Sequence, residues 1–132
     1  MKTKSIRQVI NFKALPHVIY ELLMDSRKHS DFTGEDARIN REKGGTFTAY
    51  GEYISGKNLE LIQDEKIVQS WRTSDWPDEY YSTVTYSLKK TKTGTRLVFS
   101  QEGVPAGQYK AISLGWKNFY WKPLKALLND KG

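Results

Sequence analysis

The sequence predicts an α+β fold in which a curved antiparallel β-sheet wraps around one long C-terminal helix. Residues 106–129 show the three-to-four spacing of apolar residues that is typical of a buried helical stripe. Most of the chain before them alternates apolar and polar residues, as half-buried strands do. Turn sequences such as Gly44-Gly45, Asp64-Glu65 and Thr93-Gly94 separate the alternating segments. A sheet curved enough to hold a long helix can also hold a ligand beside it.

The first third of the chain predicts one strand followed by two short helices. Residues 5–13 alternate, with Ile6 and Ile10 on one face. Pro16 suits the first turn of a helix, because its missing N–H group has no helical partner there in any case. The polar segment 25–36 predicts a second short helix and a loop.

The middle of the chain predicts an antiparallel meander. Gly56 interrupts one of its strands, and we expect a bulge or a bend at this residue. The expected strands are 46–52, 53–63, 66–72, 81–90 and 95–103.

The final helix carries two residues that weaken a regular helix. Gly115 costs about 1 kcal/mol relative to Ala in a helix interior, and Pro123 removes the hydrogen bond to the Phe119 carbonyl and should bend the helix. The predicted buried stripe is Tyr109, Ile112, Trp116, Phe119 or Tyr120, Pro123 and Leu127.

Composition predicts a single domain covering residues 1–132. Charged residues make up 27% of the chain, as in ordinary soluble proteins. No apolar run reaches the roughly 18 residues of a membrane-spanning helix, so we expect no membrane span. The sequence contains no cysteine, which excludes disulfides and thiolate nucleophiles and is compatible with the cytoplasmic location that we expect.

The formal net charge of +6 predicts mainly a solvated surface. Basic residues are scattered among acidic ones, and the densest cluster, 89–92, falls at a predicted hairpin turn, where lysines also protect a strand edge. We therefore expect no nucleic-acid partner, although an anionic partner remains an alternative.

The sequence shows no arrangement of residues that is typical of an active site. His17 and His29 have no partner at metal-binding spacing, and both are interpreted as ordinary surface histidines. No serine lies in a G-x-S-x-G context, and the paired carboxylates fall at turns. We expect no metal, no cofactor and no catalytic residue.

The best candidate site is a cavity between the sheet and the final helix. Strand alternation places Gln69 and Tyr86 on the core-facing side, where a polar group needs a partner, water or a ligand. Gln69 and Tyr86 can instead be satisfied locally, and Trp116 and Tyr120 can simply be core residues. The predicted lining residues are Gln69, Trp71, Tyr86, Phe99, Ile112, Trp116 and Tyr120.

Several motifs together resemble a known family. They include Gly44-Gly45-Thr46-Phe47, Ile67-Val68-Gln69-Ser70-Trp71-Arg72, Trp76-Pro77, Gly103-Val104-Pro105 and Gly115-Trp116. Their order along nearly the whole chain is similar to that in the activator of heat-shock-protein-90 ATPase homologue family, a branch of the START-like (SRPBCC) superfamily. The resemblance implies the helix-grip fold, with two small helices after the first strand.

The resemblance and the residues leave three functions open. Our first hypothesis is the binding of a small apolar or amphipathic molecule in the cavity, as the wider superfamily implies. The second is interaction with a heat-shock chaperone, with an exposed Trp76-Pro77 loop as the expected contact, unless Trp76 folds back over the sheet. The third is a metal-independent enzyme that uses a Tyr, Asp or Glu for proton transfer.

Overall fold

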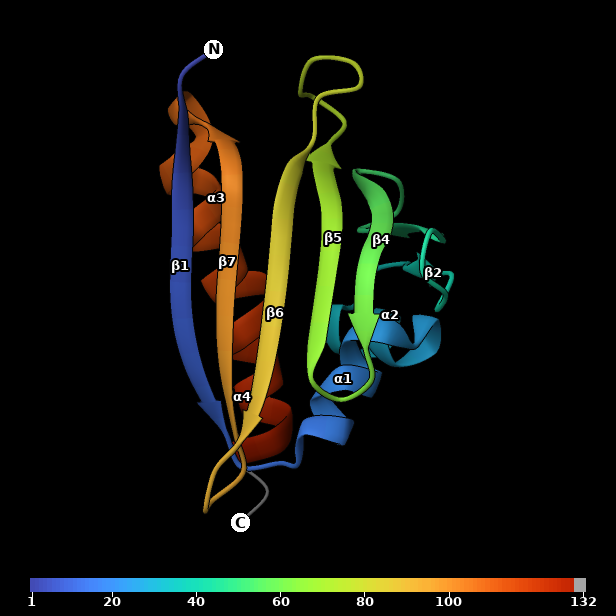
Figure 1. Cartoon of the computed structure of the whole chain (residues 1–132), viewed down its shortest axis with the longest axis vertical. Coiled ribbons are helices and arrows are strands. Elements are labelled where there is room, and N and C mark those ends of the chain that lie inside the picture. Colours follow the sequence, from blue (N-terminus) through green and yellow to red (C-terminus); the bar gives the residue numbers. More distant parts are fainter. Residues whose placement is uncertain (130–132) are drawn as a thin grey trace.

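A computed structural model describes residues 1–129 of the chain, and it contains a seven-stranded antiparallel sheet. The strand order is β1-β7-β6-β5-β4-β3-β2, and the C-terminal helical segment lies against one face of this sheet (Figure 1). The predicted helix-grip fold is confirmed. The strands are β1 (Thr3–Phe12), β2 (Arg38–Ile39), β3 (Thr46–Ala49), β4 (Ile54–Ile62), β5 (Lys66–Thr73), β6 (Ser82–Lys90) and β7 (Thr95–Pro105).

The two predicted short helices follow β1. Helix α1 (Pro16–Met24) has its proline in the first turn, and α2 (Ser26–Thr33) begins where the Asp25 carboxylate accepts a hydrogen bond from the Lys28 N–H, 2.9 Å. Gly34 ends α2 in a left-handed conformation with φ of 78°. Within α1, Ile19, Leu22 and Leu23 are buried, whereas Val18 is exposed.

The C-terminal helical segment changes its winding three times. A 3₁₀ turn η1 (Ala106–Gln108) leads into α3 (Tyr109–Trp116), then into a π-helical turn η2 (Lys117–Trp121), then into α4 (Lys122–Asn129). The π-helical turn comes two residues before Pro123, and the Lys122 N–H bonds to the Lys117 carbonyl five residues back.

This π-helical turn explains an error in the predicted stripe. A π turn takes up more than 3.6 residues, so it rotates the residues after it around the helix axis. Leu127 was expected in the core, but it is 37% exposed; of the alternatives Phe119 and Tyr120, Tyr120 is the buried one. Trp121 and Leu124 are buried instead.

Gly56 is not the bulge in its strand. The irregularity in the β4–β5 register lies between Asn58 and Glu60. Gly56 is required for a different reason, because a Cβ atom at this residue would lie 1.7 Å from the Ser70 carbonyl oxygen. The close approach of β5 therefore excludes any side chain here.

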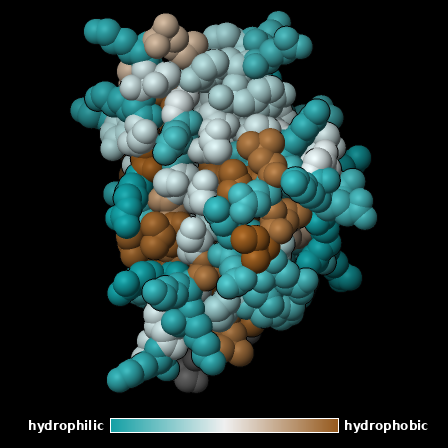
Figure 2. All heavy atoms as spheres, in the orientation of Figure 1, coloured by the Kyte–Doolittle hydropathy of each residue, from teal (hydrophilic) through white to brown (hydrophobic). Residues whose placement is uncertain are grey.

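The inner face of the sheet forms the core with the helices. Along β5 and β6 every second residue is buried, as the alternation predicted. The opposite face, seen in Figure 2, is mostly hydrophilic with scattered apolar side chains. In the part of the chain that the structure describes, no helix has both the length and the apolar character needed to cross a membrane.

Candidate functional site

A pocket of about 860 Å³ lies between the sheet and the C-terminal helical segment. Three parts of the chain form its walls. The strands contribute Ile54, Trp71 and Thr73, and the loop between β3 and β4 contributes Tyr50 and Tyr53. The remaining lining residues are Glu35, Asp75, Gln108, Ala111, Ile112, Gly115, Trp116, Phe119 and Tyr120.

Four of the seven predicted lining residues line this pocket, and they come from opposite walls. Trp71 stands on β5, whereas Ile112 and Trp116 stand on α3 and Tyr120 on the π-helical turn. Ile112, Trp116 and Tyr120 recur at four-residue spacing and therefore face the same side. Gly115 lies among them, and the absence of its side chain widens the pocket.

Gln69, Tyr86 and Phe99 do not line the pocket. The Gln69 amide donates a 3.1 Å hydrogen bond to Asn58 Oδ1, so Gln69 is satisfied within the sheet. Tyr86 and Phe99 pack against each other with ring centroids 5.5 Å apart, and Phe99 lies 4.4 Å from Trp116. These two rings form the solid core behind Trp116.

A chain of buried hydrogen bonds holds the Trp116 ring in place. Trp116 Nε1 donates to Gln101 Oε1 at 2.8 Å, and Gln101 Nε2 donates to Ser82 Oγ at 3.0 Å. Ser82 Oγ donates in turn to the Trp71 carbonyl at 2.9 Å. The two tryptophans, whose rings are also in contact with centroids 5.7 Å apart, are thereby connected through β6 and β7.

His29 is buried next to the pocket residue Tyr120, and its interpretation as a surface histidine was wrong. It is 6% exposed, with Nδ1 3.1 Å from the Leu23 carbonyl and Nε2 2.9 Å from Tyr120 Oη. A carbonyl can only accept, so Nδ1 carries the proton and Nε2 accepts the Tyr120 hydroxyl hydrogen. Burial lowers the pKa of His29 to about 4, although the bond to Leu23 opposes this shift.

His17, in contrast, is exposed as expected. Its Nδ1 lies 2.9 Å from Asp64 at the surface.

The charged groups of the pocket are negative. Glu35 and Asp75 are its charged residues, and no lysine, arginine or histidine lines it. Tyr50 Oη donates to the Phe119 carbonyl at 3.1 Å. Burial, and next the nearby Glu35 carboxylate, raise the pKa of Tyr50 to about 12, so its hydroxyl is protonated at neutral pH.

Sequence reasoning missed Glu35, Tyr50 and Tyr53 because they lie in loops. The turn that carries Tyr50 and Tyr53 has a left-handed backbone at Tyr50 and Gly51, with φ of 51° and 69°. Only the glycine gives a hint of this turn in the sequence.

Trp76 is buried at 3% exposure, so the alternative that it folds back over the sheet is confirmed and the exposed tryptophan contact was wrong. Its Nε1 donates to Gln108 Oε1 at 2.8 Å, and its ring lies 5.5 Å from that of Trp71. Arg72 of β5 donates a 2.7 Å hydrogen bond to the Trp76 carbonyl, which connects the loop to the strand before it. Trp76 therefore covers one end of the sheet, whereas Pro77 and the two acidic residues after it remain exposed.

Metal-dependent chemistry has no ready site within residues 1–129. No three His, Asp or Glu side chains of this part come together in a group that could hold a metal ion. The pocket instead offers aromatic surface, two carboxylates and Tyr120, whose hydroxyl is hydrogen-bonded to His29 outside the lining.

Comparisons with known proteins agree with this architecture. The chain is 33% identical over 118 residues to an activator of 90 kDa heat shock protein ATPase homolog from Dictyostelium discoideum, covering 87% of this chain and 30% of that protein. It is 25% identical over 114 residues to human activator of 90 kDa heat shock protein ATPase homolog 1, covering 86% of this chain and 34% of that protein. It thus spans about a third of the length of these relatives.

A solved structure shows the same fold. The crystal structure of an HSP90 activator from Plasmodium falciparum superimposes with a TM-score of 0.85 at 23% identity, covering 95% of this chain and 94% of that chain. The family model described as Activator of Hsp90 ATPase homolog 1-like protein matches residues 13–129, from the end of β1 to the end of α4. The chain therefore belongs to the Activator of Hsp90 ATPase homolog 1-like family.

Proposed function

We propose that this chain binds a chaperone of the 90 kDa heat-shock class and raises its ATPase rate. The observation that carries the proposal is the family match over residues 13–129. The Plasmodium protein supports it further, because that chain is described as an HSP90 activator and 94% of it is covered by this fold. The proposed location is the cytoplasm, and the absence of cysteine from the sequence is compatible with it.

Two exposed segments are the proposed contacts. One is the loop after Trp76, where Pro77, Asp78 and Glu79 are exposed, and the other is the outer surface of residues 25–36. Trp76 supports the loop from the core and does not itself reach a partner.

The test is the ATPase rate of the purified chaperone from the same host at increasing concentrations of this protein. We expect a rate increase that saturates, and that disappears when an inhibitor blocks the nucleotide site of the chaperone. Absence of both binding and stimulation at tens of micromolar would exclude the proposal. Replacement of Pro77, Asp78 and Glu79 by alanine should weaken the effect, whereas replacement of the distant Lys89 and Lys90 should not.

A second candidate function is the binding of a small, partly apolar ligand, and the pocket between the sheet and α3 favours it. Its volume of about 860 Å³ falls within the usual range of ligand sites. Trp71, Ile112 and Trp116 supply apolar walls. Glu35 and Asp75 favour a ligand whose polar end is cationic or donates hydrogen bonds. Tyr120 fits the same ligand, because its proton is already donated to His29.

Native mass spectrometry of gently purified protein tests this second function. A bound molecule should be lost in Ile112→Ala, since Ile112 lines the pocket and is only partly buried. Leu114→Ala is the matched control, because Leu114 lies on the same helix, is 56% exposed and does not line the pocket. Equal retention in both variants would count against the pocket as the site.

A further inference from the structure

The positive charge of the protein is concentrated on two elements that lie side by side. The strand β1 carries Lys4 and Arg7, and the helical segment Ala106–Asn129 carries Lys110, Lys117, Lys122 and Lys125. Neither element contains an aspartate or a glutamate. Their six positive charges equal the formal net charge of +6, so the rest of the chain is formally neutral.

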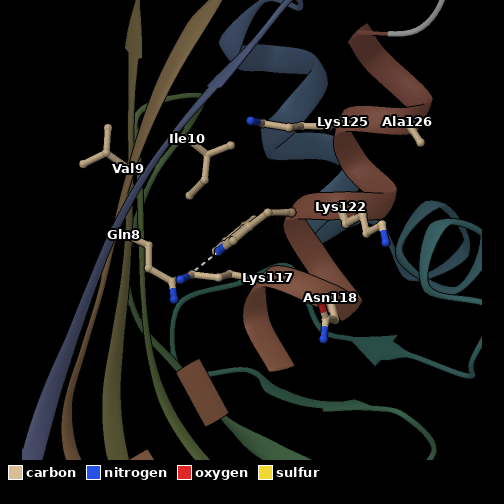
Figure 3. Close-up of a pocket in the computed structure, with 9 residues that line it drawn as sticks. Gln8, Val9, Ile10, Lys117, Asn118, Lys122, Lys125 and Ala126 are labelled. Carbon is tan, nitrogen blue, oxygen red and sulfur yellow. Dashed lines mark hydrogen bonds between the residues drawn. The ribbon is translucent and has the colours of Figure 1, made fainter. Parts of the chain in front are cut away.

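A second groove runs between these two elements. It has a volume of about 590 Å³ and is lined on one side by Gln8, Val9 and Ile10 of β1. Its other side is the C-terminal helical segment, with Lys117, Lys122 and Lys125 among the lining residues. Lys117 and Lys125 extend from the helix toward β1 (Figure 3).

These lysines are available to a partner. Lys117, Lys122 and Lys125 are all exposed. The ion pairs found within residues 1–129 involve His17, Arg38, Arg41 and Lys66, and none of the lysines of the groove. Like charges brought together in this way repel one another and favour an anionic occupant.

The floor of the groove is rigid. Trp121 Nε1 donates to Gln8 Oε1, the contact drawn as a dashed line in Figure 3. Gln8 Nε2 donates to both the carbonyl and the hydroxyl oxygen of Ser113 at 3.0 Å. Because these bonds hold β1 and the helix at a fixed separation, the groove exists without a partner.

The strand that borders the groove is at the edge of the sheet. Within the described part of the chain, β1 pairs with β7 on one side only and stands at the end of the strand order. It is ten residues long, whereas β2 at the opposite edge has only two. A long edge strand leaves a row of backbone N–H and C=O groups for another chain to pair with.

We propose that this groove binds an extended, acidic segment of a partner protein, which adds to the sheet along β1 and places carboxylates against Lys117 and Lys125, the two lysines that extend toward β1. The backbone groups of β1 favour a polypeptide over other polyanions, because neither a nucleic acid nor a membrane can continue the β-ladder. Trp121, the large ring of the groove, is buried and offers no stacking surface to a base. The proposal does not depend on chaperone binding or on a ligand in the larger pocket.

The probe is a synthetic ten-residue peptide with glutamate at alternate positions and threonine or valine between them. Its affinity is measured by fluorescence anisotropy at low and moderate salt. The test variant combines Lys117→Glu, Lys122→Glu and Lys125→Glu. The control combines Lys89→Glu, Lys90→Glu and Lys92→Glu, three exposed lysines near the β6–β7 hairpin, and it changes the net charge by the same amount.

We expect the groove variant to lose about tenfold or more in affinity, because it loses its ion pairs with the peptide and its new carboxylates repel those of the peptide, and the control to lose less than threefold. Hydrogen exchange should slow at the amides of β1, and a peptide N-methylated at alternate residues should bind much more weakly.

Three results would overturn the proposal. One is an equal loss in both variants, which shows attraction by net charge alone. Another is full binding of the N-methylated peptide, which shows that no strand is added. The third is tighter binding of single-stranded DNA or of anionic vesicles than of the peptide, which assigns the surface to another class of partner.

Discussion

The hydroxyl of Tyr50 donates a hydrogen bond to the carbonyl of Phe119, 69 residues later in the chain, at 3.1 Å. Pro123 has no N–H group and cannot donate to this carbonyl, which is four residues before it. Tyr50 supplies a donor from the loop between β3 and β4. The bond therefore joins the irregular part of the helix to the rim of the larger pocket.

Tyr50→Phe should weaken this connection while it keeps the ring. We expect a loss of about 1 kcal/mol in the free energy of unfolding, which is typical of one hydrogen bond, and faster hydrogen exchange in residues 117–121. Tyr53→Phe is the control, because Tyr53 lies in the same loop and is 46% exposed. Chemical denaturation measures both, and equal stability of the two variants would show that the bond contributes nothing.

Gly56→Ala should be among the most damaging single changes in the sheet. The new Cβ would lie 1.7 Å from the Ser70 carbonyl and 2.9 Å from the Phe47 ring, so β4 and β5 must separate. We expect a loss of more than about 3 kcal/mol or failure to fold, as overpacking of this kind forces backbone shifts. Gly107→Ala is the control, since nothing lies within 4 Å of its added Cβ. Comparable thermal stability of the two variants would contradict the close approach.

The strands could be predicted because their pattern is local. Apolar and polar residues alternate on β5, β6 and β7, and that alternation alone indicates which side chains enter the core. The π-helical turn could not be predicted in the same way. Pro123 indicates a disturbance, but whether the helix bends or takes up an extra residue depends on what Trp121 and Leu124 can pack against, which is a tertiary question.

The site was only half predictable for a similar reason. Trp116 and Tyr120 follow from helical spacing, whereas the burial of His29 depends on α2 packing near the π-helical turn. Gln69 was placed correctly on the inner face, but its partner Asn58 lies across the β4–β5 pair, and sequence alone does not give that register. The lysine groove was missed because its two walls, β1 and the C-terminal helical segment, come from opposite ends of the chain.

We expect the Gln101 side chain to stabilise the position of the Trp116 ring more than it stabilises strand β7. Gln101→Leu leaves the Trp116 indole N–H without its partner in the core, which costs about 1–3 kcal/mol. Trp116→Phe in the same background removes that donor and should recover part of the loss, apart from the cost of the smaller ring. A double-mutant cycle measured by denaturation gives the coupling, and additive losses would show that the bond has no energetic role.

Removal of Trp116 is a poor test of ligand binding, because Trp116 is also a packed core residue. Its ring lies within 6 Å of those of Trp71, Phe99 and Tyr120, at 5.7, 4.4 and 4.6 Å. Trp116→Ala should therefore cost about 3–5 kcal/mol of folding free energy through the cavity that it leaves. Ile112→Ala changes the same wall of the pocket with far less effect on the core, and denaturation of both variants should show this difference.

His29 should make the protein sensitive to mild acid. The pKa of His29 is about 4 in the folded chain and 6.5 when the side chain is exposed to water, as in the unfolded chain. The unfolded chain therefore takes up a proton first as the pH falls. The contribution of His29 to stability is therefore constant above about pH 6.5 and decreases toward pH 4, by up to about 3 kcal/mol. His29→Gln removes this titration. The variant is expected to be less stable near neutral pH, because the bonds to Leu23 and Tyr120 are disturbed, but the gap to the parent protein should narrow by about 2–3 kcal/mol between roughly pH 7 and pH 4.5. Carboxyl groups titrate in both proteins, so their contribution cancels in this difference. Urea denaturation across that range measures the gap, and a gap that stays constant would show that His29 takes up its proton in the folded state as readily as in the unfolded chain.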